Sequence, residues 1–267
     1  MKNLFRMAVA AWFLTGLFAA LPGKAQPLVA GTVQVTDAVL KPTGTHKIDR
    51  TYLVWDGRSN CAAGVVPPLV IAFHGGGGSS AGMAAQFAPQ GCNVVAYPSG
   101  SDKNGSTIVV NGNGLSWNAY AVPEQGWSGT AGVDENQFIL ALVAKLKAQF
   151  GTGKTFGVGL SKGGMLVHHA ACDLAAFDAI ATVAATIADP TCNPALHVPL
   201  FHVHGLADTR VCWTFTGTSC NPWPVAEPKV TAWNAVGGPH QLTLIPGEPH
   251  GWPAGTTANI WTWLRAR

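Results

Sequence analysis

Short apolar runs that alternate with segments of helical periodicity constrain the fold of this chain more than any other feature. Continuous apolar runs are typical of strands that helices cover on both faces of a parallel sheet. The expected strands are residues 69–73, 93–97, 155–160, 179–185, 200–204 and 241–245. The expected helices lie near residues 81–87, 134–150, 162–173 and 258–267. The pattern predicts an α/β protein with a mostly parallel central sheet and helices on both faces.

Composition and charge narrow the classes of function. Hydrophobic residues make up 48% of the 267 positions and charged residues 11%, a balance that excludes a disordered chain. Three of the 16 basic residues precede position 26, so the 13 that remain match the 13 acidic residues. A neutral chain has no overall attraction to polyphosphate, so nucleic acid is not an expected partner. No repeat or linker divides residues 26–267, which we predict to form one domain without a separate binding module.

The N-terminus has the pattern of a secretory signal. Lys2 and Arg6 precede an apolar stretch over residues 7–21, and Gly23 and Ala25 then place small residues three and one positions before a cleavage point. This order predicts a signal peptide over residues 1–25 and a secreted or periplasmic mature protein that is not bound to a membrane. A membrane anchor is the alternative, but a spanning helix needs about 20 apolar residues and this run is shorter.

The number of cysteines agrees with export. An even number of cysteines in an exported chain indicates disulfides, and six cysteines allow fifteen pairings. We predict the pairs Cys61–Cys92, Cys172–Cys192 and Cys212–Cys220. The alternative for Cys172 is a free thiol buried on an apolar helix face. The chain has no C-x-x-C motif, so neither a zinc site nor thioredoxin chemistry is expected.

One short motif points to chemistry. Gly159-Leu160-Ser161-Lys162-Gly163 matches G-x-S-x-G, the strand-to-helix turn that exposes the nucleophile of an α/β-hydrolase fold. Ser161 directly follows an expected strand and opens an expected helix, as this turn requires. The backbone N–H of Lys162, the residue after the nucleophile, would then be one oxyanion donor. Gly78-Ser79-Ser80-Ala81-Gly82 is a second match, but Ser80 lies several residues beyond its strand, so we expect a helix cap or loop hydroxyl there.

A serine nucleophile requires a base and an acid, and the chain order supplies both. His250 lies in the loop after the last expected strand, and Asp208 follows the strand before it. The order Ser161, Asp208, His250 is the one expected of this fold. Three other acids compete with Asp208 but fall in less suitable segments: Asp173, Asp178 and Asp189.

The remaining histidines have simpler interpretations. His202 and His204 alternate along an expected strand and could bind a metal from one face, but no third ligand has matching spacing. His168 and His169 follow the Ser161 turn in its helix, where we expect them to pack or to cap. His74 precedes a run of four glycines and is expected to orient that run through a hydrogen bond. The glycine run itself could supply an oxyanion N–H, with a flexible loop or a dinucleotide turn as the alternatives.

Seven segments occurring in order make the chain similar to a known family. They are Phe73-His74-Gly75-Gly76-Gly77, Ala96-Tyr97-Pro98-Ser99-Gly100, Ser116-Trp117-Asn118, Val133-Asp134-Glu135, Gly159-Leu160-Ser161-Lys162-Gly163-Gly164-Met165, His204-Gly205-Leu206-Ala207-Asp208 and Pro249-His250-Gly251-Trp252-Pro253. Together they resemble the polyhydroxybutyrate depolymerase-like esterases, a group close to feruloyl and acetyl-xylan esterases. The resemblance runs from about Tyr52 to the C-terminus. It implies Ser161 as nucleophile, Asp208 as acid, His250 as base and Gly76 as the second oxyanion donor.

The chain departs from the family pattern at three places. Lys162 stands where the family often has Asn, which keeps the backbone donor but puts a cation near the site. Pro249-His250-Gly251 replaces a more usual Gly-His-Thr. Residues 211–223 contain two cysteines between acid and base and have no counterpart that we recognise, so this segment is expected to shape the substrate pocket.

These observations lead us to expect a secreted serine carboxylesterase that needs no metal or cofactor and acts on a small or oligomeric ester. A feruloyl or acetyl-xylan esterase, an amide hydrolase or peptidase with the same triad, and a non-catalytic binding protein are the alternatives. Trp213, Trp223 and Trp252 lie near the base in sequence and could form an aromatic wall for the substrate, or could belong to the core. The sequence leaves the oligomeric state open.

Overall fold

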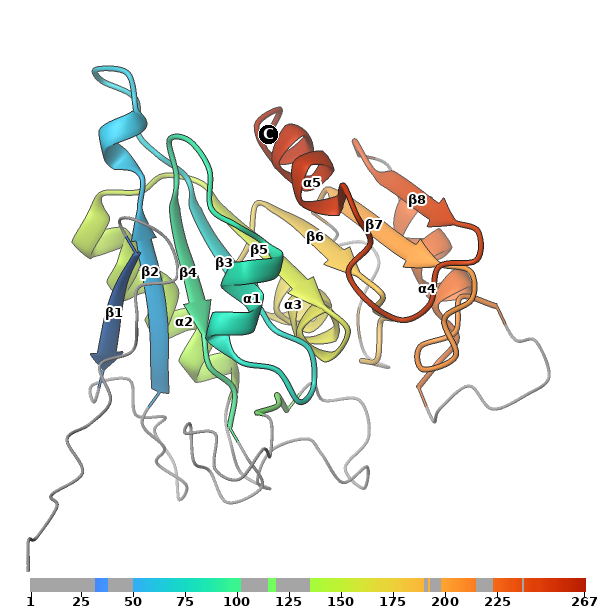
Figure 1. Cartoon of the computed structure of the whole chain (residues 1–267). Coiled ribbons are helices and arrows are strands. Elements are labelled where there is room, and N and C mark those ends of the chain that lie inside the picture. The colour runs from blue at the N-terminus through green and yellow to red at the C-terminus, as the bar shows by residue number, and fades with distance from the viewer. Residues whose placement is uncertain are drawn as a thin grey trace, which may run out of the picture.

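The computed structural model describes residues 32–37, 50–101, 115–118, 135–189, 192, 198–214, 223–236 and 238–267. Within this part of the chain eight strands form one sheet in the order β1-β2-β4-β3-β5-β6-β7-β8 (Figure 1). The strands are β1 Thr32–Asp37, β2 Arg50–Asp56, β3 Leu69–Phe73, β4 Val94–Pro98, β5 Thr155–Leu160, β6 Ala179–Val183, β7 Leu200–Gly205 and β8 Gln241–Ile245. β1 and β2 pair antiparallel, β2 pairs antiparallel with β4, and all other neighbours are parallel.

Helices cover both faces of this sheet. They are η1 Arg58–Asn60, α1 Ser80–Gln86, α2 Glu135–Phe150, α3 Lys162–Asp173, α4 Ala226–Asn234 and α5 Thr256–Leu264. Because successive side chains of a strand point to opposite faces, Ile71 and Phe73 of β3 pack with α2, α3 and α4, whereas Val70 and Ala72 pack with α1 and α5. Figure 1 shows α1 and α5 in front of the sheet and α2 and α3 behind it. Both faces therefore bury a core, which confirms the predicted α/β class.

The six predicted strands and four predicted helices all form, with ends that shift by up to two residues for most of them. The sequence analysis missed β1, β2, η1 and α4. The sequence of β2 is Arg-Thr-Tyr-Leu-Val-Trp-Asp. Its centre is buried, but the polar residues at both ends shorten the apolar run, so the segment was not predicted as a strand. α4 contains Pro228 and β-branched residues, which have low helix propensity, and it is held by burial of Val230 and Trp233. Tertiary packing therefore stabilises a helix that local propensity does not favour.

Two buried side chains fix the start of α2 against the antiparallel end of the sheet. The Arg50 guanidinium donates to Glu135 at 2.7 Å, and both side chains are fully buried. Glu135 also accepts from the backbone N–H of Asn118 at 3.2 Å. Trp117 lies under the same guanidinium, 5.8 Å from the ring centroid. The short segment 115–118 is thus tied to the sheet, and bridges join Leu115 to Gly78 and Ser116 to Ser101.

Two of the predicted disulfides are present, Cys61–Cys92 and Cys172–Cys192. Cys172 is therefore not the free thiol considered as an alternative. Cys212 is buried and also disulfide-bonded, while Cys220, the partner predicted for it, lies outside the described residues. The two disulfides are consistent with an extracellular or periplasmic compartment.

The predicted signal peptide, residues 1–25, lies outside the described part of the chain. Among the residues that the structure describes, none of the helices combines the length and the apolar character needed to cross a membrane.

Candidate active site

Ser161 occupies a strained turn at the carboxyl end of β5, in the middle of the sheet. Its backbone has φ 52° and ψ −119°, a conformation that L-residues other than glycine rarely adopt. The flanking glycines make the turn sterically feasible. A Cβ on Gly159 would lie 2.5 Å from the Gly163 carbonyl and the Gly164 nitrogen, and a Cβ on Gly163 would overlap the carbonyl oxygens of Phe73 and His74. The turn therefore has the geometry expected of a nucleophile elbow.

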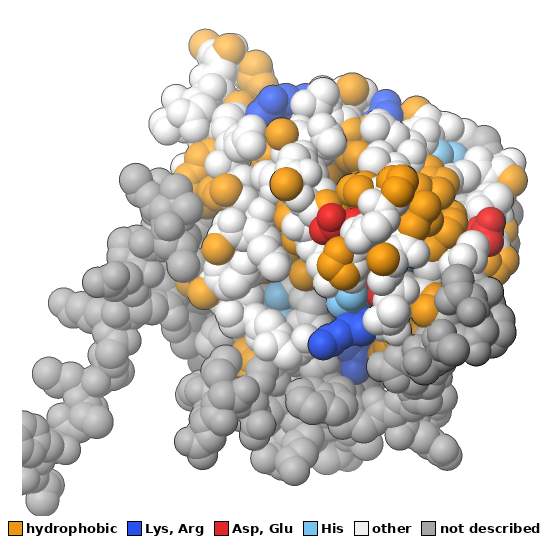
Figure 2. All heavy atoms as spheres, turned by 45° about the vertical axis from the view of Figure 1, so that its right-hand side comes forward, with side chains coloured by type: hydrophobic (Ala, Val, Ile, Leu, Met, Phe, Trp, Pro, Cys, Tyr) orange, Lys and Arg blue, Asp and Glu red, His pale blue; other side chains and the backbone are white. Residues whose placement is uncertain are grey.

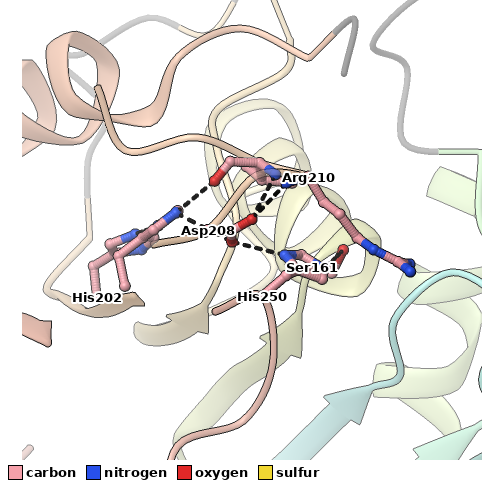
Figure 3. A network of polar contacts seen from close by, with 7 residues as sticks. Ser161, His202, Asp208, Arg210 and His250 are labelled. Atoms are coloured by element: carbon pink, nitrogen blue, oxygen red, sulfur yellow. Dashed lines mark hydrogen bonds and ion pairs between the residues drawn. The ribbon is translucent and has the colours of Figure 1, made fainter. Parts of the chain in front are cut away.

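His250, in the loop after β8, reaches the Ser161 hydroxyl. Its Nε2 accepts from the Ser161 hydroxyl, with 3.0 Å between Nε2 and Oγ (Figure 3). The opposite ring nitrogen, Nδ1, donates to Asp208 Oδ2 at 2.7 Å. These two hydrogen bonds fix the tautomer of His250. Because an ionised carboxylate only accepts hydrogen bonds, Nδ1 must carry the proton and Nε2 must carry the lone pair. The arrangement gives the imidazole a free lone pair toward the serine, which is the requirement for a general base.

Asp208 lies in the turn after β7 and is 4% exposed. Its Oδ1 accepts from the backbone N–H groups of Arg210 at 2.8 Å and Val211 at 2.9 Å. Burial by itself raises the pKa of the carboxyl group, but hydrogen bonds from His204, His250 and Val211 outweigh it and hold the pKa of Asp208 well below its usual range. Asp208 therefore stays ionised opposite His250 across the neutral range.

A chain of buried histidines supports the Asp208 turn from behind. His204 Nε2 donates to the Val211 carbonyl at 2.7 Å and lies 3.5 Å from Asp208 Oδ2. Because a carbonyl only accepts, Nδ1 of neutral His204 must accept from His202 Nε2, 2.9 Å away. His202 Nδ1 in turn accepts from the Thr182 hydroxyl at 2.8 Å. Burial, reinforced by electrostatic repulsion from His204 and His168, lowers the pKa of His202 well below its usual value, so His202 stays neutral.

The hydrogen bonds of His202 and His204 argue against the metal site that the sequence analysis considered on β7. Both ring nitrogens of His202 and of His204 are engaged in the hydrogen bonds just described, and neither residue offers a lone pair to a shared metal. His168 is buried beside them, with Nε2 3.1 Å from the Thr182 hydroxyl, which agrees with the packing role expected for it.

The glycine run after β3 lies against the Ser161 turn. A Cβ on Gly75 would lie 3.5 Å from the Cβ of Ser161, and a Cβ on Gly76 would lie 3.7 Å from the Lys162 stem. Within the described part of the chain, the backbone N–H groups of Gly76 and Lys162 have no hydrogen-bond acceptor. Two free N–H groups on adjacent segments beside a serine are what an oxyanion hole requires. A hollow of about 380 Å³ lies next to the run, between it, α1 and Leu160.

His74 orders this glycine run, as expected. Its Nε2 accepts from the Gly100 N–H at 2.9 Å, so Nδ1 carries the proton and donates to the Gly75 carbonyl at 2.7 Å. The Trp117 indole donates to the His74 carbonyl at 2.8 Å. Burial lowers the pKa of His74 to about 4, so the ring remains neutral and this pattern persists at neutral pH.

The three tryptophans predicted near the base have different surroundings. Trp213 is 5% exposed and stacks on His202 at 5.9 Å, so it has the core role kept as its alternative. Trp252 is partly buried, packs against Phe87 and donates to the Thr257 hydroxyl at 3.1 Å. Trp223 is partly buried and lies under the Lys162 ammonium, 5.4 Å from its ring centroid. Trp223 is therefore the tryptophan that the structure connects directly to the Ser161 turn.

The competing candidates fall elsewhere. Ser80 is the first residue of α1, and its hydroxyl accepts from the Ser99 hydroxyl at 3.1 Å. Ser79, and not Ser80, caps this helix by accepting from the Gly82 N–H. Asp178 accepts from the Thr155 N–H, which places it at the amino end of β5, opposite to Ser161.

Asp173, the last residue of α3, and Asp189, in the segment after β6, belong to a separate cluster around His169. His169 Nδ1 lies 2.6 Å from Asp189 and 3.6 Å from Asp173, while its Nε2 lies 2.8 Å from Asn136. Among the described residues, His169, Asp173 and Asp189 each offer one donor atom within 4.8 Å of the others and are the group whose geometry could hold a metal ion. The sequence analysis gave these residues no such role, because their separation of four and sixteen positions is no recognised ligand spacing.

Two residues near the site were missed by sequence reasoning. Ser116 is buried beside Gly76, and its hydroxyl lies 3.6 Å from where a Gly76 Cβ would be. Arg210 is exposed two residues after Asp208, and Figure 3 shows its side chain running past Ser161 on the side away from His202. The segment Ser116-Trp117-Asn118 was the available signal for the first. A basic residue in the loop of the acid was the signal for the second.

Comparisons with known proteins agree with the architecture. The chain is similar to esterase PE8, with 19% identity, a TM-score of 0.56, and coverage of 80% of this chain and 96% of that one. It is also similar to an α/β serine hydrolase without a lid from Xanthomonas campestris, with 16% identity, a TM-score of 0.53, and coverage of 89% and 94%. A puromycin-hydrolysing peptidase of Mycobacterium tuberculosis shares 14% identity and a TM-score of 0.58, over 88% of this chain but 38% of the peptidase.

These likenesses establish that the protein has the α/β-hydrolase fold. No family model matches the sequence, and no curated protein matches it either.

Proposed function

We propose that this protein is a serine carboxylic-ester hydrolase, of the polyhydroxybutyrate depolymerase-like type, that is secreted or periplasmic and works through an acyl-enzyme. The observation that carries the proposal is the pair of hydrogen bonds that His250 makes, to Ser161 at 3.0 Å and to Asp208 at 2.7 Å. Three side chains distant in sequence meet in the geometry and order of a catalytic triad.

The geometry supports a two-step acyl transfer. His250 Nε2 takes the proton of the Ser161 hydroxyl as the oxygen attacks the ester carbonyl carbon. The N–H groups of Gly76 and Lys162 hold the oxygen that becomes negative, and Asp208 stabilises the imidazolium. The same proton then passes to the leaving alcohol. A water molecule, deprotonated by His250, next attacks the acyl-serine, releases the acid and restores the free hydroxyl.

An active-site label tests the assignment of the nucleophile. A fluorophosphonate forms a covalent bond only with an activated serine, so the wild-type protein should be labelled and peptide mapping should place the label on Ser161. The Ser161→Ala variant should remain unlabelled. Labelling at Ser80, or no labelling of the folded wild-type protein, would contradict the proposal, and the second result would favour a binding protein.

The scissile bond is tested by matched substrates. The same triad can cleave amides, so release of nitroaniline and nitrophenol from one acyl group compares the two bonds directly. We expect kcat/KM to be larger for the ester than for the amide. The ester-to-amide ratio of kcat/KM should be well above the ester-to-amide ratio of the uncatalysed hydrolysis rates.

A feruloyl or acetyl-xylan esterase is the second candidate within the class of ester hydrolases. A panel of hydroxybutyrate oligomers, methyl ferulate and short nitrophenyl esters separates the two.

A further inference from the structure

The Ser161 turn carries a cation that the described part of the protein does not neutralise. Lys162 follows the nucleophile directly and is 5% exposed, yet no carboxylate among the described residues pairs with its ammonium group. A nearly buried ammonium without a counter-ion is unfavourable, because it loses hydration that nothing replaces. Such a group is typical of sites in which a ligand supplies the opposite charge.

Packing keeps this ammonium at the site. The Lys162 stem runs beside Gly76, one of the two expected oxyanion donors. The ammonium lies 5.4 Å from the ring centroid of Trp223, and Trp223 packs on a small buried cluster that includes Met165 and Val211. Burial lowers the pKa of Lys162 to about 8, so the side chain is mostly charged at neutral pH.

A second polar group beside Gly76 has no partner. Ser116 is 2% exposed, and its hydroxyl has no hydrogen-bond partner among the described residues. It lies against Gly76, as the Lys162 stem does, so both groups face the same glycine. A buried hydroxyl that has lost its water without gaining a partner is unfavourable, and an oxygen atom of a ligand would restore the bond.

A second cation lies on the outer side of the triad. Arg210 is exposed, has no carboxylate partner among the described residues, and extends past Ser161 in Figure 3. Figure 2 shows basic side chains beside a histidine on one face of the molecule. Asp208 forms no direct ion pair with Arg210 or Lys162; its oxygens accept hydrogen bonds from His250 and from the backbone N–H groups of Arg210 and Val211.

We propose that the site selects esters that carry a free carboxylate close to the scissile bond, with the carboxylate held by Lys162, Ser116 and Arg210. The inference rests on the proposed esterase function and names the substrate class of the same site. Half-esters of dicarboxylic acids and short oligomers of hydroxyacids have this chemistry. Their carboxylate would replace the missing counter-ion of Lys162, whereas a neutral ester would leave the ammonium unpaired.

The experiment compares substrates that differ only in charge. One pair is the dimer of 3-hydroxybutyrate with a free carboxylate and the same dimer as its primary amide, which places the charge on the alcohol half. The other pair is a monoester of adipic acid and the corresponding adipamide ester, which places it on the acyl half. In at least one pair we expect kcat/KM of the acid to exceed that of the amide by tenfold or more in the wild-type enzyme.

Variants assign that preference to residues. Lys162→Met and Arg210→Gln should each lower the acid-to-amide ratio of kcat/KM by about fivefold or more, mainly through KM of the acid. Ser116→Ala should lower the ratio less, and Lys162→Arg should restore most of it. Lys147→Met, at the end of α2, is the control and should keep the wild-type ratio. Because the readout is a ratio, a change in overall activity does not affect it.

The outcomes separate the two proposals. If the enzyme cleaves nitrophenyl butyrate but prefers neither acid to its amide, the carboxylate proposal is wrong while the esterase stands. If the preference exists but survives in both Lys162→Met and Arg210→Gln, the assignment to these residues is wrong. If the folded protein cleaves no ester at all, both proposals fail together.

Discussion

Two turns of this protein share the pattern G-x-S-x-G and have opposite structural roles. At Ser161 the serine follows β5 immediately, has a positive φ, and its hydroxyl reaches His250. At Ser80 the serine lies in the first turn of α1, outside the strained region of backbone space, and its hydroxyl is bound by Ser99. The three defining residues of the motif, Gly, Ser and Gly, are thus the same in both turns, while the structural surroundings differ.

The difference shows what makes a serine a candidate nucleophile. The glycines around Ser161 permit backbone contacts too close for any side chain, because β5, α3 and the end of β3 converge there. Gly82 of the second motif has only the Ser79 hydroxyl nearby, at 3.4 Å from a Cβ built on it. The first turn is therefore specified by tertiary contacts, and the second is an ordinary helix start.

Removal of the two serines should give the largest contrast. Ser161→Ala should reduce kcat for ester hydrolysis by about 10⁴-fold or more, because the acyl-enzyme can no longer form. Ser80→Ala should keep kcat within about twofold, as surface changes away from a site usually do. Steady-state kinetics with nitrophenyl butyrate measure both. Comparable losses in the two variants would contradict the distinction between the turns.

Removal of the acid should come second in size. Asp208→Asn leaves the shape of the turn but favours the wrong His250 tautomer, so we expect a loss of about 10³- to 10⁴-fold in kcat. Asp178→Asn, whose carboxylate lies at the other end of β5, is the matched control for a change of charge. A kcat of Asp208→Asn near that of the wild type would show that His250 acts without this carboxylate.

Glycine substitutions test the steric side of the comparison. Gly163→Ala should destabilise the protein by about 3 kcal/mol, because its Cβ would overlap the carbonyl oxygens of Phe73 and His74. Gly82→Ala should be neutral or stabilise by up to about 1 kcal/mol, since alanine favours a helix and finds room. Urea denaturation gives both free energies of unfolding. Equal effects would mean that the Ser161 turn can relax.

The pH dependence of stability should give the smallest signal. His74, in the loop that leads to Ser80, has a pKa lowered to about 4 by burial, against about 6.5 in the unfolded chain. Between these values the unfolded state binds more protons, so the free energy of unfolding should fall as pH is lowered from 6.5 to 4, by a few kcal/mol at most. His74→Asn should flatten that slope in thermal unfolding, whereas Ser80→Ala should not. An unchanged slope in His74→Asn would exclude His74 as its source.

Much of the site could be predicted because its signals are local. The apolar runs indicate strands, the glycine-flanked Ser161 indicates an elbow, and the loops after the last two strands indicate where acid and base should lie. Chain order then assigns Asp208 and His250. The structure brings these three side chains together as expected.

Two networks of buried side chains around the site could not be predicted, because no pattern of neighbouring residues indicates them. Arg50 and Glu135 are 85 positions apart, and only their burial against Trp117 and Phe138 shows that they fix segment 115–118 beside the site. The link from Thr182 through His202 and His204 to the Asp208 turn likewise joins two strands through side chains, so no spacing within either strand encodes it.

The sequence by itself determined the α/β architecture, the order along the chain of the three candidate residues Ser161, Asp208 and His250, and which serine stands at a strand-to-helix turn. Periodicity, glycine placement and chain order can all be read from the sequence without knowledge of the tertiary contacts. Only the tertiary structure decided which groups surround that serine: a lysine over Trp223, a buried hydroxyl at Ser116 and a histidine chain behind the acid. Such contacts depend on burial, which sets the cost of an unpaired charge or hydroxyl, and burial arises only when distant segments pack together.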